Sequence, residues 1–120
     1  SDVSDRNFRR SGMDYLERAA ITRHISFGAF ENWRRQAGHR LVLAETDGAT
    51  AHTEFAFLPG DIVLVGRESA GVLPEVAAAA EASVHVPMRP GLRSLNVAIA
   101  AALVVGEALR QLGGYPDPAA

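Results

Sequence analysis

Polar residues that could bind a ligand lie directly before the most apolar segment of the sequence. The stretch "VPMRPGLRSLN" spans residues 86–96 and combines two arginines with Ser94 and Asn96. Arginine pairs well with phosphate groups, and the free N–H groups of a helix start attract anions. Serine and asparagine are also ordinary helix caps. The stretch therefore predicts either a small polar ligand at this helix start or a helix that is simply well capped.

Two further loops of similar character follow strand-like apolar runs. "LAETDG" ends at residue 48, where Asp47 and Gly48 predict a turn, and "VGRESAG" covers residues 65–71. In open α/β sheets, ligands bind beyond the carboxyl ends of the strands. A glycine such as Gly66 lets a ligand approach the backbone closely. These loops predict a site at one edge of a sheet.

Standard catalytic motifs are missing from the sequence. It contains no GxSxG, no HExxH, no P-loop and no GxGxxG after a strand. Its four histidines lack metal-ligand spacing and fit solvated or strand-end positions, and it has no cysteine. We therefore expect neither hydrolytic chemistry nor a bound metal.

Composition fits one cytoplasmic domain of modest size. The chain has 120 residues, a formal net charge of -2 and arginines that crowd its first quarter. The longest apolar run, residues 97–105, is far shorter than the ~20 residues of a membrane span, so no transmembrane segment is expected. Absence of cysteine suits a reducing compartment. The arginines could still form a basic face on a nearly neutral protein.

Apolar periodicity predicts alternating helices and strands. The expected elements are helices at 4–12, 27–38, 73–82 and 94–112 and strands at 39–46, 60–66 and 83–88. This order indicates an α/β fold with a mostly parallel sheet and helices on both faces. The unbroken apolar run at 62–65 predicts a strand that is buried on both faces.

Two helices carry more specific expectations. In the helix at 27–38, Phe27 and Phe30 should point inward together with either Trp33 or Arg34. The last helix is apolar nearly all round, which predicts cover on more than one side. A sheet of only three strands offers little surface to cover the apolar faces of these helices. Either residues 20–26 supply another strand, or the chain starts after the first strand of its fold, which we favour.

Three motifs in order resemble the SPOUT family of RNA methyltransferases. They are "RNFRRSGMDYLERAAITRH", "VGRESAGVLPEV" and "VPMRPGLRSLNVAIAAALVVGEALRQLG", of which the third is the most specific. Together they cover almost the whole chain. The closest resemblance is to the small single-domain group that methylates the ribose 2'-oxygen of the wobble nucleotide in tRNA.

The resemblance implies a C-terminal deep trefoil knot, made by loops 66–71 and 86–96, that holds S-adenosylmethionine. Carried over by position, the cofactor would contact Ala44, Gly66, Val86 and Ser94, with backbone around Glu45, Thr46, Met88 and Leu95 completing the pocket. Glu68 lies near this pocket, either in contact with the cofactor and the chemistry or as an acceptor that pins the knot.

The resemblance also implies partners and roles. Arginines that would contact tRNA are Arg6, Arg9, Arg10, Arg89 and Arg93. Arg6, Arg9 and Arg10 share one helix face, which would otherwise be an ordinary solvated surface. Ser94 and Asn96 are the candidate catalytic residues that hold the cofactor loop and the ribose, and capping alone is the alternative. A homodimer through the last helix is also implied.

Relatives begin with a strand and helix that carry an Asn-x-Gly-x-x-x-Arg motif, and we expect this opening segment to be missing from this chain. Residues 1–114 would then be one knotted domain that is incomplete at its N-terminus, and residues 115–120 a tail. Gly106 stands where relatives often carry tyrosine. Rival hypotheses are a non-catalytic knotted module that binds cofactor or RNA and, with less support, a flavodoxin-like regulatory domain.

Overall fold

The structure is a computed structural model that describes residues 21–66, 72–91 and 96–119. These residues fall into two compact units that divide between Phe30 and Glu31, inside helix α3. The first unit contributes residues 21–30, of which residues 21–26 form no strand. The suggestion that residues 20–26 supply an extra strand is therefore wrong for the part that is described.

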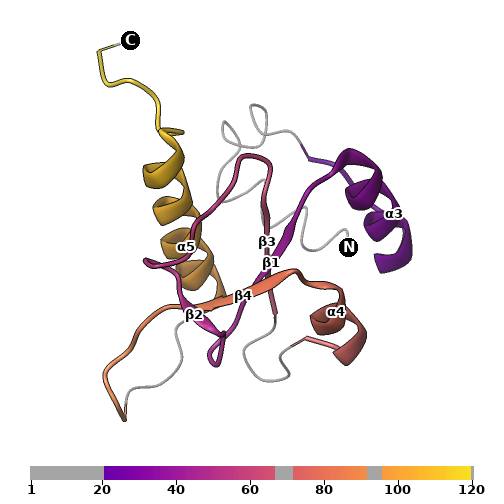
Figure 1. The fold of residues 1–120 in the computed structure, drawn as a ribbon, viewed down its shortest axis with the longest axis horizontal. Helices are drawn as coiled ribbons and strands as arrows, with labels where there is room; N and C mark the ends of the chain where they lie inside the picture. The colour runs from indigo at the N-terminus through magenta and orange to yellow at the C-terminus, as the bar shows by residue number, and fades with distance from the viewer. Residues whose placement is uncertain (1–20, 67–71, 92–95, 120) are drawn as a thin grey trace, which may run out of the picture. The chain divides into compact units, whose positions relative to one another are not determined.

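A parallel sheet forms the centre of the second unit (Figure 1). Its strands lie in the order β2-β4-β1-β3 and all pair in parallel. Their bounds are β1 Leu41–Ala44, β2 Thr50–Ala51, β3 Ile62–Val65 and β4 Ala82–His85. The predicted α/β fold with a parallel sheet is confirmed.

Burial differs sharply between the strands. In the central strand β1, Leu41 and Val42 are fully buried on opposite faces of the sheet. Strand β3 is half-buried along its whole length. The prediction that β3 is buried on both faces is wrong for the described chain, because β1 is its one neighbour in the sheet.

Strand β2 was not expected from the sequence. It is two residues long and pairs with the end of β4, Thr50 opposite Val84 and Ala51 opposite His85. Because β4 lies between β1 and β2, the connecting residues 45–49 must cross β4. This crossing places the loop after β1 against the neighbouring strand.

Helix α3 (Phe27–Ala37) begins and ends close to the predicted positions. The Ser26 hydroxyl oxygen accepts a hydrogen bond from the Ala29 N–H at 3.0 Å, and Gly38 follows the helix with a φ of 77°. Arg34 has an exposed fraction of only 1 %, whereas Trp33 is 42 % exposed. Arg34 is therefore the inward residue of the two alternatives.

The later helices are shorter than expected. Helix α4 (Pro74–Ala79) starts with the predicted proline, and helix α5 (Val97–Leu112) ends at Gly113, which has a φ of 65°. A start of α5 at Ser94 is wrong, because Asn96 has non-helical backbone angles. Its Oδ1 accepts from the Ala98 N–H at 2.8 Å, so Asn96 is the N-cap.

The core lies between the sheet and α5, which packs against β1 and β3. Val42, Val84, Val104 and Phe57 form its buried centre. The exposed apolar side chains of α5 are Ile99, Leu103, Val105 and Leu112. Within the described chain, α5 is thus covered mainly on its sheet side, and the expected cover on a further side stays a prediction.

Candidate functional site

The predicted cofactor residues converge where the parallel strands end. Ala44 is the last residue of β1 and is paired with Val65 on one side and Val84 on the other. Gly66 follows Val65 directly, and Val86 follows the last residue of β4. Parallel strands end at a common edge, and ligands bind at such edges in open α/β sheets. The structure therefore brings Ala44, Gly66 and Val86 together, as the sequence predicted.

The loop that carries Glu45 and Thr46 lies directly on β4. The Glu45 N–H donates to the Val84 carbonyl at 3.0 Å. Gly48 is buried, and a Cβ on it would lie only 2.2 Å from the Val84 oxygen. The sequence identified Gly48 as a turn residue, but its stronger requirement is this close backbone contact.

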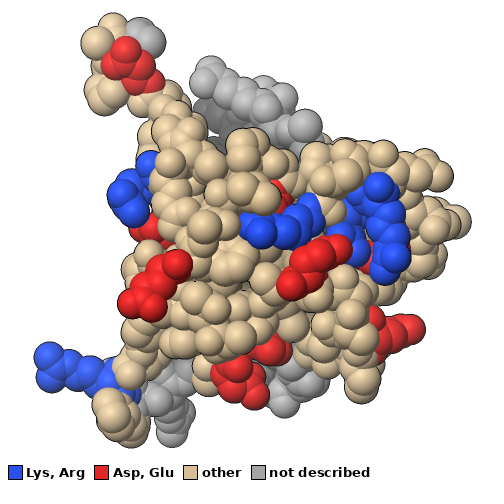
Figure 2. Space-filling view, viewed as in Figure 1, with Lys and Arg blue, Asp and Glu red and all other residues tan. Residues whose placement is uncertain are grey.

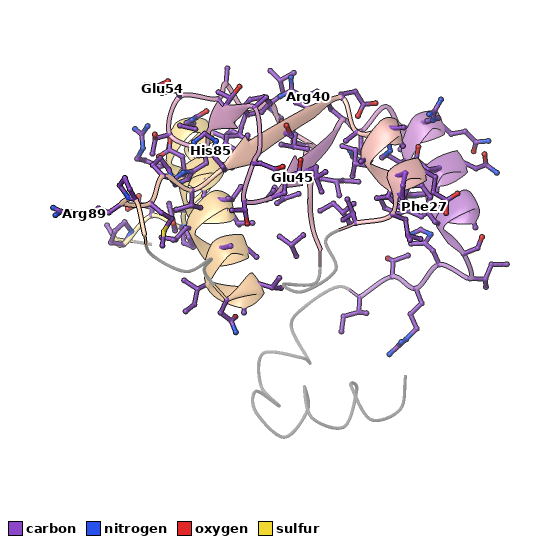
Figure 3. All side chains as sticks on the ribbon, turned by 90° about the horizontal axis from the view of Figure 1, so that it is seen from below. Phe27, Arg40, Glu45, Glu54, His85 and Arg89 are labelled. Atoms are coloured by element: carbon purple, nitrogen blue, oxygen red, sulfur yellow. The ribbon has the colours of Figure 1, made fainter. Side chains whose placement is uncertain are left out.

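Glu45 is a half-buried carboxylate at the carboxyl edge of the sheet. Its side chain makes no hydrogen bond or ion pair with another described residue. Burial raises its pKa, and the negative charge of Asp47 adds to the effect. The backbone of Glu45 bonds to Val84, which directly precedes His85 in β4; Figure 3 labels Glu45 and His85. The Glu45 carboxylate, which bonds to no other described residue, could accept from a cationic or hydrogen-bond-donating ligand.

Val86 and Met88 combine apolar side chains with backbone groups that bond to no other described residue. Val86 packs against the core, whereas Met88 is 41 % exposed. The backbone N–H and C=O groups of Val86 and Met88 make no hydrogen bond with another described residue. An apolar surface with free backbone donors and acceptors suits an adenine ring. These residues fit the nucleoside part of the predicted cofactor.

Arg89 is exposed and extends away from the sheet (Figure 3), with no acidic partner among the described residues. On the face that Figure 2 shows, basic and acidic side chains are interspersed and form no single basic surface. Salt bridges among the described residues join Arg40 to Asp61 and Arg110 to Glu107. Arg89 thus makes no ion pair within the described part of the chain and could bind an anionic ligand.

Asn96 was predicted as a catalytic residue together with Ser94. Its side-chain oxygen is committed to capping α5, which is the structural alternative that the sequence left open. Its amide N–H₂ group makes no hydrogen bond with another described residue. The cap orients this group at the helix start.

Several predicted residues lie outside the described ranges and stay predictions: Arg6, Arg9, Arg10, Glu68, Arg93, Ser94 and Leu95. The same holds for residues 67–71 and 92–95 of the two loops of the expected knot. In residues 21–66, 72–91 and 96–119, no cluster of histidine and carboxylate side chains could hold a metal ion. Nor does any helix in these ranges have the length and apolarity to cross a membrane.

Comparison with known proteins agrees with this geometry. The sequence model of the SpoU rRNA Methylase family matches residues 1–106. The chain belongs to this family. A tRNA (cytidine(34)-2'-O)-methyltransferase of Ancylobacter novellus is 60 % identical over 113 residues, which cover 94 % of this chain and 72 % of that protein.

Solved structures of the SpoU family have the same fold. One, from work on the 2-OH methylation of C/U34 on tRNA, superposes with a TM-score of 0.78 at 36 % identity, covering 88 % of this chain and 68 % of that one. Another is the SpoU methyltransferase AviRb from Streptomyces viridochromogenes in complex with AdoMet. It gives a TM-score of 0.67 at 32 % identity over 75 % of this chain and 38 % of AviRb.

Proposed function

We propose that this protein transfers a methyl group from S-adenosylmethionine to the ribose 2'-oxygen of nucleotide 34 of tRNA. The observation that carries the proposal is the convergence of Ala44, Gly66 and Val86 at one sheet edge in a SpoU family member. The name of the Ancylobacter novellus relative and the similar structure from work on C/U34 methylation support nucleotide 34 as the position. A tRNA substrate favours action in the cytoplasm.

The cofactor would be held mainly by backbone and small side chains of the carboxyl edge. Ala44 and Val86 offer apolar contact, and Met88 offers backbone groups that bond to no other described residue. Glu45 and Thr46 directly follow Ala44, and the backbone of Glu45 is held by bonds with Val84 and Gly48. We extend the same role to Gly66, Glu68, Ser94 and Leu95 by position in the sequence. When bound, S-adenosylmethionine supplies an electrophilic methyl group on a sulfonium.

The contribution of the protein is chiefly alignment, because a displacement at the methyl carbon needs the ribose oxygen in line with it. In the proposed site, Ser94 and Asn96 position the ribose at the start of α5. The amide N–H₂ of Asn96 bonds to no described residue and could make such a contact while its Oδ1 caps the helix. Removing Oδ1 would therefore disturb the helix start, whereas Asn96→Asp keeps the cap and removes the donor.

Arginines would bring the tRNA to this edge. Arg89 extends from the loop after β4 and is exposed. We propose that it contacts phosphate together with Arg93 and with Arg6, Arg9 and Arg10. Phosphate contacts position a nucleic acid without reading its sequence, and they weaken as salt increases.

A second copy of the chain would cover the exposed side of α5. Ile99 and Leu103 are 53 % and 44 % exposed, and Val105 and Leu112 are exposed as well. An apolar helix face of this kind marks an association surface. Light scattering should give the mass of a dimer, and Ile99→Glu with Leu103→Glu should give a monomer. A wild-type monomer at micromolar concentration would contradict the dimer.

Methyl transfer tests the proposed function directly. The protein should transfer labelled methyl from S-adenosylmethionine to unmodified tRNA and yield a 2'-O-methylated nucleoside from position 34. A matched tRNA with 2'-deoxyribose at position 34 should accept no methyl group. Transfer to the deoxy tRNA, or label on a base, would contradict the proposal. Cofactor binding without transfer would favour the non-catalytic module.

A further inference from the structure

Two side chains of β4 form hydrogen bonds with the same peptide group of the loop after β1, one with its C=O and one with its N–H. His85 Nδ1 lies 2.7 Å from the Gly48 carbonyl oxygen, and the Ala49 N–H donates to Ser83 Oγ at 2.9 Å. The carbonyl of Gly48 and the N–H of Ala49 belong to the same peptide bond. A carbonyl only accepts, so His85 Nδ1 must carry the proton. We call this pair of hydrogen bonds the β4 clamp.

The two side chains of the β4 clamp come from a strand that is anchored in the core. Ser83 and His85 are two residues apart and so share one face of β4, while Val84 between them is fully buried in the core. The gripped peptide touches the strand itself, since a Cβ on Gly48 would overlap the carbonyl carbon of Val84 at 2.3 Å. The loop is thus held against β4 by the two hydrogen bonds and by the close backbone contact at Gly48.

The loop that the clamp holds and His85 both adjoin residues of the proposed site. The loop from Glu45 to the gripped peptide is tied at its start by the bond from the Glu45 N–H to Val84 and at its end by the clamp. His85 also directly precedes Val86. The clamp therefore fixes the spacing between the two segments, at Glu45 and at Val86, that would enclose the cofactor.

We propose that His85 and Ser83 are positioning residues for methyl transfer: by gripping the peptide between Gly48 and Ala49, they preset the cofactor site and so raise its affinity. This inference rests on the proposed function. It concerns side chains that do not themselves touch the cofactor. The effect should appear in cofactor binding and in the KM for S-adenosylmethionine, with little change in kcat.

Two substitutions separate the hydrogen bond from the ring. His85→Phe keeps a planar ring of similar size but removes the donor. His85→Asn places an amide N–H₂ near the position of Nδ1 and keeps a donor for the Gly48 carbonyl. A third variant, Ser83→Ala, removes the other half of the clamp with a minimal change of volume.

The opposite edge of the sheet provides a matched control. His39 Nδ1 lies 2.7 Å from the Gly60 carbonyl oxygen, which is the same kind of bond at the same distance. His39 precedes β1 and Gly60 precedes β3, so this bond holds the amino edge of the sheet. His39→Phe therefore removes an equivalent hydrogen bond far along the strands from the proposed site.

The experiment is calorimetric titration of each full-length variant with S-adenosylhomocysteine, with thermal unfolding measured in parallel. His85→Phe should weaken binding about five- to tenfold, the size of one lost hydrogen bond. His85→Asn should recover most of the affinity, Ser83→Ala should weaken it less, and His39→Phe should leave it unchanged.

Wild-type affinity in both His85→Phe and Ser83→Ala would overturn the inference. So would an equal loss in His39→Phe and His85→Phe, because it would reflect general destabilisation. Should His85→Phe fail to fold, the inference is decided by comparing the S-adenosylhomocysteine affinities of Ser83→Ala and His39→Phe. A wild-type protein that does not bind S-adenosylhomocysteine would instead overturn the proposed function, and the inference with it.

Discussion

The two edges of the parallel sheet hold polar side chains of similar kinds in different surroundings. At the amino edge, buried Arg34 donates to Glu31 at 2.6 Å and to Glu81 at 2.9 Å. Glu81 in turn accepts from the Leu41 N–H at the start of β1. At the carboxyl edge, Glu45 and Arg89 make no ion pair with described residues.

The amino edge has a second ion pair of the same design. Arg40, directly before β1, donates to Asp61, directly before β3, at 2.7 Å and 3.0 Å. Its guanidinium also lies 4.9 Å from the centre of the Phe55 ring. These contacts tie the starts of neighbouring strands together, so the amino edge has a structural role.

The pKa directions at the two edges are opposite. Hydrogen bonds from Arg34 lower the pKa of Glu31, and for Glu81 the opposing effect of burial is outweighed by the bonds from Arg34 and Leu41, which lower its pKa. Burial raises the pKa of Glu45. An unpaired carboxylate with a perturbed pKa is typical of functional sites. The comparison supports the proposal that the amino edge stabilises the fold and the carboxyl edge binds the ligand.

Arg34→Ala should have the largest effect on stability. It leaves Glu31 buried without its main partner, so the free energy of unfolding should fall by about 3 kcal/mol. Arg35→Ala is the control, because Arg35 is 68 % exposed and also contacts Glu31. Arg35→Ala should lower the free energy of unfolding, measured by denaturant titration, by less than about 0.5 kcal/mol. Equal losses in both variants would refute the structural role of the buried arginine.

Gly48→Ala should damage the carboxyl edge most. The new Cβ meets backbone atoms of Val84, which cannot rotate away, so unfolding should require about 1–3 kcal/mol less free energy. Binding of S-adenosylhomocysteine should be lost as well. Gly28→Ala in α3 is the control, since its Cβ would meet only Ser26 Oγ at 3.8 Å. Normal binding of S-adenosylhomocysteine by Gly48→Ala would show that the close contact between loop 45–49 and β4 is not needed for the cofactor site.

Arg89→Gln should weaken tRNA binding and leave stability unchanged. Loss of one phosphate contact lowers the slope of log affinity against log salt by about 1. The measurement is fluorescence anisotropy with labelled tRNA at several salt concentrations. Arg35→Gln makes the same charge change at the amino edge and should leave the slope as it is. A slope that drops in both variants would mean that net charge, and not location, governs binding.

The pH dependence of stability should differ in sign between Glu31 and Glu45. The lowered pKa of Glu31 contributes stability above its ordinary value of 4.5 that is lost as pH falls. The raised pKa of Glu45 contributes stability below 4.5 that is lost as pH rises through the folded-state value.

At neutral pH, Glu45→Gln should therefore slightly stabilise the protein, whereas Glu31→Gln should destabilise it. Both should approach the wild type in acid, as measured by denaturant titrations at several pH values. A loss of stability in Glu45→Gln at neutral pH would indicate a structural partner for this carboxylate. It would contradict the claim that only the carboxylates of the amino edge stabilise the fold.

Local sequence signals predicted most of the described helices and strands correctly. The apolar runs at β1 and β3 and the glycine after α3 give both the type and the approximate bounds of these elements. The convergence of Ala44, Gly66 and Val86 was also predictable, because parallel strands end together. Hydrophobic period, turn chemistry and strand direction were therefore sufficient for this part of the fold and of the site.

Features that depend on distant neighbours were not accessible. β2 has only two residues, and its pairing with β4 is set by the loop that crosses at Gly48. The half burial of β3 depends on its place in the strand order, which an apolar run does not reveal. His85 and the Gly48 carbonyl are 37 residues apart, so no local pattern predicts their bond.

Hydrogen–deuterium exchange with and without S-adenosylhomocysteine tests the division between the edges most directly. The ligand should slow exchange in residues 45–49 and 86–89. Exchange at His39, Leu41, Asp61 and Glu81 should be unchanged. Protection of the amino edge, or equal protection of both edges, would contradict the assignment of the carboxyl edge as the cofactor site.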